Sequence, residues 1–135
     1  MAVHDPIWER IRAEAAEDAQ HEPMLASFLH SVVLNHDTFE KALSFHLASK
    51  LGSTTLPAIA VRDLIEEAFE DATIGEAFRA DIQAVCTRDP ACRGYSVPLL
   101  HFKGFHAIQS YRVAHYYWTR GREPLALYLQ SRMSE

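Results

Sequence analysis

The sequence predicts an all-α fold, a single domain of about seven helices over residues 1–135. Apolar residues recur every three or four positions through most of the chain, which is the spacing of one helix face. No segment shows the sustained apolar–polar alternation with β-branched enrichment that is typical of strands. Because 48% of the 135 residues are hydrophobic, the chain can bury a core without disulfides or metals.

The first helix is expected over residues 6–20. It begins where an N-cap acceptor, Asp5, precedes Pro6, and a proline is favoured in the first helical turn. A second helix is expected over residues 24–34. Its apolar stripe is too broad for a helix with one buried edge, so we expect this helix to be largely buried.

A third helix is expected over residues 38–51, with Asp37 as its cap and Gly52 just past its last turn. After a short polar link, Pro57 opens a fourth helix over residues 58–71. Its apolar positions again follow the helical period, while the acidic and basic residues between them face water.

The fifth helix is expected over residues 74–87 and should end near Arg88, because the residue before a proline is pushed out of the helical region. A connection then leads to an uninterrupted helix over residues 98–120, which Gly121 closes. A last short helix follows over residues 122–133.

Charge and hydropathy exclude several classes of protein. The net charge of −5 argues against a general nucleic-acid binder, which normally carries a basic face. No run of eighteen apolar residues is present, so we expect no membrane span. The N-terminus, MAVHDPIWERIRAEAAED, lacks the basic start and apolar core of a signal peptide. We therefore expect a cytoplasmic protein in which Cys86 and Cys92 are reduced thiols.

Catalytic and metal-binding patterns are absent from the sequence. Among the eight histidines, His101 and His106 are five residues apart and His106 and His115 are nine apart, whereas ligands on one helix face lie three or four apart. The two cysteines lack the short paired spacing of a zinc site. No nucleophile elbow, oxyanion loop or phosphate-binding loop is present. We expect no metal, with a site assembled from distant helices as the alternative.

Asp89 is the one carboxylate that invites a functional interpretation. It stands at a helix end, before Pro90, between Arg88 and Arg93. A carboxylate on a rigid turn is well placed to receive the ammonium group of a ligand. The alternative is that Asp89 only caps the turn, and the residues alone favour this structural role because Asp-Pro turns are common.

The helix expected over residues 98–120 also has two interpretations. Its apolar residues go nearly all the way round, which indicates a helix buried in the core or between subunits. Gly104 and Ala107 would allow a close backbone approach at a subunit contact. Aromatic enrichment marks both cores and interfaces, so the two interpretations stay open.

Long motifs in the second half of the chain resemble a known family. The segments DIQAVCTRDPA and PLLHFKGFHAIQSYRVAH, with EPMLASFLHSVVLNH, ALSFHLASKLG and LPAIAVRDLIEEAFED upstream in the same order, resemble the helical N-terminal domain of serine O-acetyltransferase. The resemblance covers essentially the whole chain. In that family, the enzyme transfers an acetyl group from acetyl-CoA to the hydroxyl of L-serine, on the way to cysteine, which inhibits by feedback.

The resemblance implies that Asp89, with Pro90 beside it, helps to bind the amino-acid head group of L-serine or L-cysteine. A carboxylate suits the ammonium of such ligands. The resemblance also implies a homo-oligomer in which the N-terminal helices pair trimers into a hexamer. Acetyl-CoA would be the co-substrate of the full-length enzyme, and we expect this domain to bind no cofactor.

Chains of this family continue into a left-handed β-helix of hexapeptide repeats, which holds the catalytic histidines and aspartate. No hexapeptide repeat occurs in these 135 residues. We therefore expect no catalytic residue in this part, and no acetyltransferase activity from it alone. The alternative is a free-standing helical module that self-associates or docks on a partner without catalysis.

Overall fold

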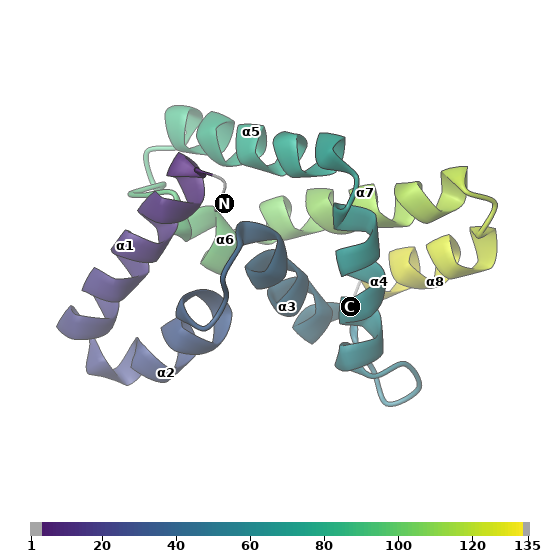
Figure 1. Ribbon diagram of the computed structural model, residues 1–135, viewed down its shortest axis with the longest axis horizontal. Coiled ribbons are helices and arrows are strands. Elements are labelled where there is room, and N and C mark those ends of the chain that lie inside the picture. The colour runs from purple at the N-terminus through teal and green to yellow at the C-terminus, as the bar shows by residue number, and fades with distance from the viewer. Residues whose placement is uncertain (1–3, 134–135) are drawn as a thin grey trace.

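The computed structural model describes residues 4–133, and all regular structure in that range is helical (Figure 1). The all-α prediction is confirmed. The α-helices are α1 (Pro6–His21), α2 (Ala26–Leu29), α3 (Phe39–Leu51), α4 (Ala58–Phe69), α5 (Ala72–Arg88), α6 (Ser96–His101), α7 (Lys103–Thr119) and α8 (Glu123–Met133). A 3-10 turn, η1 (Pro23–Leu25), precedes α2, and a π-helical turn, η2 (His30–Leu34), follows it.

Helix α5 lies along one side of the molecule, with α1 at one end, while α7 and α8 pair lengthwise at the other (Figure 1). Helices α3 and α4 pack against each other, and α4 also contacts α5 and α7. A chain of aromatic rings links α1, α3 and α5 inside the core. The ring centroids are 5.7 Å apart for Trp8–Phe39 and 4.8 Å apart for Phe39–Phe78.

The helix caps follow the sequence in part. Asp5 caps α1 as predicted, because its side chain accepts a hydrogen bond from the N–H of Trp8 at 3.2 Å. The prediction that Asp37 caps α3 is wrong. Thr38 takes that role and accepts from the N–H of Lys41 at 3.2 Å. The main-chain carbonyl of Asp37 instead accepts a hydrogen bond from the indole N–H of Trp8 at 3.0 Å.

The segment 24–34 is less regular and less buried than predicted. Instead of one helix it comprises η1, α2 and η2. Its burial is confined to its second half, where Leu29, Val32 and Val33 enter the core. Met24 is 88% exposed, because it lies in the opening 3-10 turn before the apolar stripe faces inward.

The prediction of one uninterrupted helix over residues 98–120 is wrong. Phe102 has extended backbone angles (φ −91°, ψ 105°) and separates α6 from α7. This break lets α6 pack on α1 while α7 packs on α4 and α8, and both helices contact α5. One straight helix could not direct both apolar stripes at these different neighbours. Gly121, with φ 78°, then ends α7 as predicted.

Helix α7 is not apolar and buried on all sides. One face is enclosed by the core, whereas three large apolar side chains of the other remain on the surface: Ile108 at 49%, Tyr111 at 53% and Trp118 at 43% exposure. The interpretation of α7 as a fully enclosed core helix is therefore wrong. Among the described residues, no atom lies within 4 Å of where a Cβ of Gly104 would be, so Gly104 makes no close approach to any of them.

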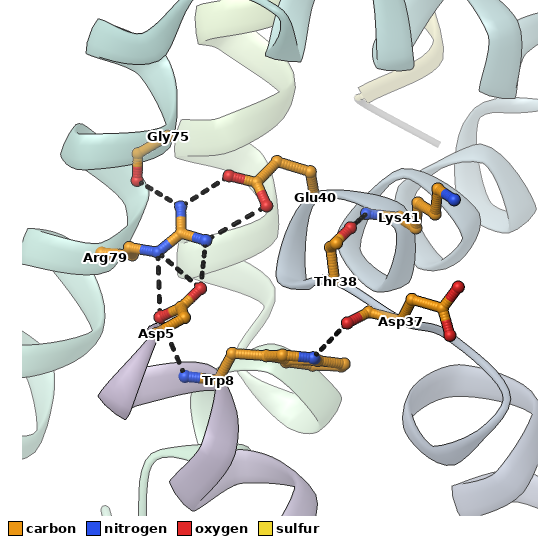
Figure 2. Close-up of polar contacts among 8 residues, drawn as sticks. All are labelled: Asp5, Trp8, Asp37, Thr38, Glu40, Lys41, Gly75 and Arg79. Atoms are coloured by element: carbon orange, nitrogen blue, oxygen red, sulfur yellow. Dashed lines mark hydrogen bonds and ion pairs between the residues drawn. The ribbon is translucent and has the colours of Figure 1, made fainter. Parts of the chain in front are cut away.

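A polar cluster around Arg79 joins three distant parts of the chain (Figure 2). The guanidinium of Arg79 on α5 contacts Asp5 Oδ2 at 2.5 Å, Glu40 Oε2 on α3 at 2.7 Å and the carbonyl of Gly75 at 3.1 Å. Partial burial raises the pKa of Asp5, but the hydrogen bonds from Arg79 and Trp8 outweigh it and hold this pKa below its ordinary value. The cluster fixes the start of α1 against α3 and α5.

Candidate functional site

Asp89 is the residue at which α5 stops. It has extended backbone angles (φ −105°, ψ 113°), and its N–H still donates to the carbonyl of Val85 at 2.9 Å. Pro90 follows, and a residue before proline is disfavoured in the helical region, so the helix ends where predicted. The carbonyl of Asp89 accepts from the N–H of Cys92 at 2.9 Å, which turns the chain back towards α6.

The carboxylate of Asp89 is exposed and only partly engaged. Its Oδ1 accepts from the N–H of Ala91 at 2.9 Å, an Asx turn over Pro90. Among residues 4–133, no donor contacts its Oδ2. Both interpretations of Asp89 are therefore compatible with the geometry, since one oxygen shapes the turn and the other is open to a ligand.

A hollow of 530 Å³ lies beside this carboxylate, between the end of α5 and the start of α7. Asp89, Arg88 and Lys103 bring charges of both signs to its lining, and the largely buried Phe105 forms part of its apolar wall. A space of this kind, with separate acidic and basic groups over an apolar wall, suits a small zwitterion. The predicted residue Pro90 is exposed and shapes the turn, but it does not line the hollow.

A cluster of polar side chains from α5 and α7 lies next to the same hollow. Gln109 is fully buried and donates from Nε2 to Asp81 Oδ2 at 2.7 Å, while Arg112 Nη1 donates to Gln109 Oε1 at 2.8 Å and pairs with Asp81. Neither Gln109 nor Arg112 was predicted from the sequence to support a site. The available signal was a glutamine four residues from both Phe105 and Val113, in an otherwise apolar stripe.

Glu14 of α1 anchors the far end of the connection. Its carboxylate accepts from the N–H of Ser96 at 2.8 Å and of Tyr95 at 3.3 Å, at the start of α6. Gly94 lies against this carboxylate so closely that a Cβ there would come within 2.8 Å of both of its oxygens. The connection between α5 and α6 is thus held at both ends.

The expectation of two reduced thiols is wrong in this structure. Cys86, in the last turn of α5, and Cys92, in the connection, are joined by a disulfide. The Cα–Cα distance is 4.9 Å, within the usual range of about 4.4–6.8 Å for bonded pairs. Sequence reasoning inferred thiols from an expected compartment, whereas the turn at Asp89–Pro90 brings the two residues together. The cytoplasmic location stays a prediction.

The histidines do not gather into a metal centre. Within residues 4–133, no group of three or more His, Cys, Asp or Glu residues is placed to hold a metal ion. Two histidines do meet in the interior: His46 on α3 and His106 on α7 have ring centroids 4.9 Å apart. His106 Nε2 lies 2.6 Å from the carbonyl of Leu99, but His106 Nδ1 and His46 Nε2 are buried without a partner.

Burial, together with the nearby charges of His106 and Lys50, lowers the pKa of His46 to about 4. Burial likewise lowers the pKa of His106, against the hydrogen bond to Leu99. Both rings are therefore neutral at pH 7.

In the described range 4–133, no helix combines the length and apolar character needed to cross a bilayer.

Fold and site together define a helical domain that presents an open carboxylate at its edge, beside a hollow with charges of both signs. The family described as "Serine acetyltransferase, N-terminal" matches residues 7–110, and the chain belongs to this family. The resemblance noted from the sequence is thereby confirmed.

Three similar proteins illustrate the match. The serine acetyltransferase of Haemophilus influenzae is 53% identical over 129 residues, which cover 95% of this chain and 48% of that protein. A serine acetyltransferase structure in complex with cysteine has a TM-score of 0.92 at 52% identity, covering 96% of this chain and 54% of that one. The Neisseria gonorrhoeae enzyme in complex with serine has a TM-score of 0.92 at 48% identity, covering 97% and 54%. This chain spans about half the length of these relatives.

Proposed function

We propose that this chain forms the N-terminal helical domain of a serine O-acetyltransferase, which transfers an acetyl group from acetyl-CoA to the hydroxyl of L-serine. In this proposal the domain contributes Asp89 to the amino-acid site. The observation that carries the proposal is the exposed Asp89 carboxylate, with Oδ2 open, at the rim of a hollow between α5 and α7. Membership of the family supplies the reaction.

Asp89 would recognise the ammonium group of the ligand. Of the structures similar to this chain, one is a complex with serine and another is a complex with cysteine. These two amino acids share the α-ammonium and α-carboxylate and differ only in hydroxyl versus thiol. One carboxylate aimed at the ammonium would therefore serve both substrate and inhibitor, through a charge-assisted hydrogen bond.

The reaction also needs a general base that removes the proton of the serine hydroxyl as it attacks the thioester. No residue of this chain is assigned that role. The buried His46 and His106 lie away from the hollow, and although His101 lines it, the resemblance places the catalytic histidines of the family in the hexapeptide-repeat part. We propose that the base and the acetyl-CoA site belong to other parts of the full-length enzyme. This domain alone would then be inactive and would bind no cofactor.

Assembly is the second part of the proposal: a homo-oligomer in which these helices pair trimers into a hexamer. The exposed apolar side chains of α7, Ile108, Tyr111 and Trp118, support a contact between chains. Light scattering on the 135-residue chain tests this at high concentration. A concentration-independent monomer would contradict a contact made by these helices alone.

The test of the site is Asp89→Asn in the full-length enzyme. We expect the KM for serine to rise about 10- to 100-fold, because a hydrogen bond to a charged group contributes about 1.5–3 kcal/mol. The KM for acetyl-CoA should stay within about twofold, since Asp89 touches only the amino acid. Steady-state kinetics with each substrate varied in turn measures both.

Asp63→Asn is the matched control, because Asp63 is an exposed carboxylate on α4, away from the hollow. It should leave both KM values unchanged. Wild-type kinetics in the Asp89→Asn enzyme would remove Asp89 from the site, whereas an enzyme that never acetylates serine would overturn the proposed reaction itself.

A further inference from the structure

The Cys86–Cys92 bond encloses the turn that carries Asp89. Cys86 lies in the last turn of α5, and Cys92 lies six residues later in the connection to α6. Asp89 and Pro90 are the middle of the enclosed segment. The bond therefore fastens the two sides of the turn, one side helical and the other irregular.

The surroundings of the two sulfur atoms suit the thiol state as well as the disulfide. Cys86 Sγ lies 3.4 Å from the carbonyl oxygen of Gly94, and Cys92 Sγ lies 3.2 Å from the same oxygen. This oxygen would accept a hydrogen bond from a thiol once the bond is reduced. Both cysteines are half-buried rather than enclosed, so part of each residue is open to solvent.

We propose that Cys86 and Cys92 form a reversible dithiol–disulfide site that sets the shape of the Asp89 turn and, through it, the affinity for the amino-acid ligand. The second half of this statement rests on the proposed function of Asp89. The partner is a dithiol protein of the thioredoxin class. One of its thiolates attacks a sulfur of the bond, and its second thiol then releases the mixed disulfide. Two electrons and two protons pass to Cys86 and Cys92, and the partner is left as a disulfide.

The oxidised state is the one with the Asp89 turn already formed. The bond closes the turn, the N–H of Ala91 holds Asp89 Oδ1, and Glu14 holds the start of α6 beyond. Reduction removes the first of these restraints, so the ligand must order the turn as it binds. Ordering even one residue costs enough to weaken binding severalfold, and we expect the reduced enzyme to have a KM for serine about 3- to 10-fold higher.

The first experiment asks whether the site exists. The 135-residue chain is equilibrated in a series of glutathione buffers of different redox potential, alkylated, and mapped by peptide mass spectrometry. We expect an intramolecular Cys86–Cys92 disulfide that appears and disappears reversibly across the series. Two thiols at every potential, or bonds only between chains, would overturn the proposal.

The second experiment asks whether the site acts on the ligand. Serine kinetics of the full-length enzyme are compared after oxidation and after treatment with a water-soluble phosphine. The phosphine takes up the oxygen of one water molecule as the two thiols form. It avoids thiol reagents, which could compete at a site that accepts cysteine. The KM for serine should rise on reduction.

Cys86→Ser/Cys92→Ser is the matched control, since it resembles the dithiol pair and cannot be oxidised. Its KM for serine should equal that of the reduced enzyme under both conditions; Cys86→Ala/Cys92→Ala replaces it if the serines impair folding. A redox effect that persists in the double variant would come from elsewhere and would overturn the proposal. An active enzyme with a KM indifferent to redox state would overturn the switch alone, whereas no serine acetylation in either state would overturn the proposed function.

Discussion

Two acidic regions of this domain use their carboxylates in opposite ways. In the Arg79 cluster, Asp5 and Glu40 both point at one guanidinium, and each is about a third exposed or less. At the end of α5, Asp89 is exposed and has one oxygen without a partner in the described chain. The cluster uses its charges to join helices, whereas the turn keeps part of its charge available.

The two regions differ in their remaining capacity to accept hydrogen bonds. Both oxygens of Asp5 accept from Arg79, and Oδ1 also accepts from Trp8. A ligand could bind Asp5 only by breaking these bonds. Asp89 gives one oxygen to the backbone and could bind a ligand with the other. The predictions below test this contrast, from the largest expected effect to the smallest.

Arg79→Met should destabilise the domain by about 2–3 kcal/mol, somewhat less than the ~3–5 kcal/mol lost at fully buried pairs. The variant leaves Asp5 and Glu40 close together without a cation. Urea unfolding followed by circular dichroism measures the free energy of unfolding. Arg122→Met is the matched control, because its pair with Glu67, at 4.0 Å, is more than half exposed; it should cost less than about 1 kcal/mol. Equal losses would contradict a structural role for the cluster.

Acid should weaken the interior before it reaches the Arg79 cluster. The pKa of His46 is lowered from 6.5 to about 4 in the folded state. Its contribution to stability is therefore complete above pH 6.5 and is lost as the pH falls towards 4, because the unfolded chain binds the proton first. Between pH 8 and pH 5 we expect a loss of about 2 kcal/mol. Asp5, whose pKa is lowered, adds its loss only below its ordinary value of 3.8.

Urea unfolding at pH 8, 6.5 and 5 measures how the free energy of unfolding depends on pH. His46→Gln should reduce this dependence and leave the part due to His106, whereas His30→Gln, at an exposed position on η2, should leave it unchanged. The groups that face His46 are His106 on α7, Lys50 on α3 and His101 near the end of α6. An unchanged pH dependence in His46→Gln would assign the acid sensitivity to these neighbours.

Asp89→Asn should change the free energy of unfolding by less than about 0.5 kcal/mol, because surface substitutions away from buried networks are usually within that limit. The amide oxygen of asparagine can still accept from the N–H of Ala91, so the turn is kept. Thermal and urea unfolding of the isolated chain measure this. A loss near that of Arg79→Met would make Asp89 a structural residue and remove the contrast.

Sequence periodicity was enough for the fold class and for most helix boundaries. Helix α1 begins at Pro6 and α5 ends at Arg88, because a cap and a proline act locally and are visible in the sequence. The break at Phe102 was missed, since no proline or polar stretch marks it. It arises from tertiary packing, which directs α6 towards α1 and α7 towards α4 and α8, with α5 in contact with both.

The site was predictable only at its most local level. Asp89 and Pro90 were predicted as ligand-binding residues because an Asp-Pro turn and a family motif coincide there, and this role stays a prediction. The support from Gln109 and Arg112 depends on how α5 and α7 approach each other, and the disulfide depends on how the turn folds back. Such contacts between segments leave little trace in the spacing of single residues.

Glu14 and Gly94 carry one further consequence. The carboxylate of Glu14 caps a helix that begins more than eighty positions later, and Gly94 leaves the room that it needs. A larger residue at position 94 displaces the acceptor, and a shorter acid at position 14 leaves the amide of Ser96 unmet. The space at position 94 and the length of the acid at position 14 are therefore physically coupled.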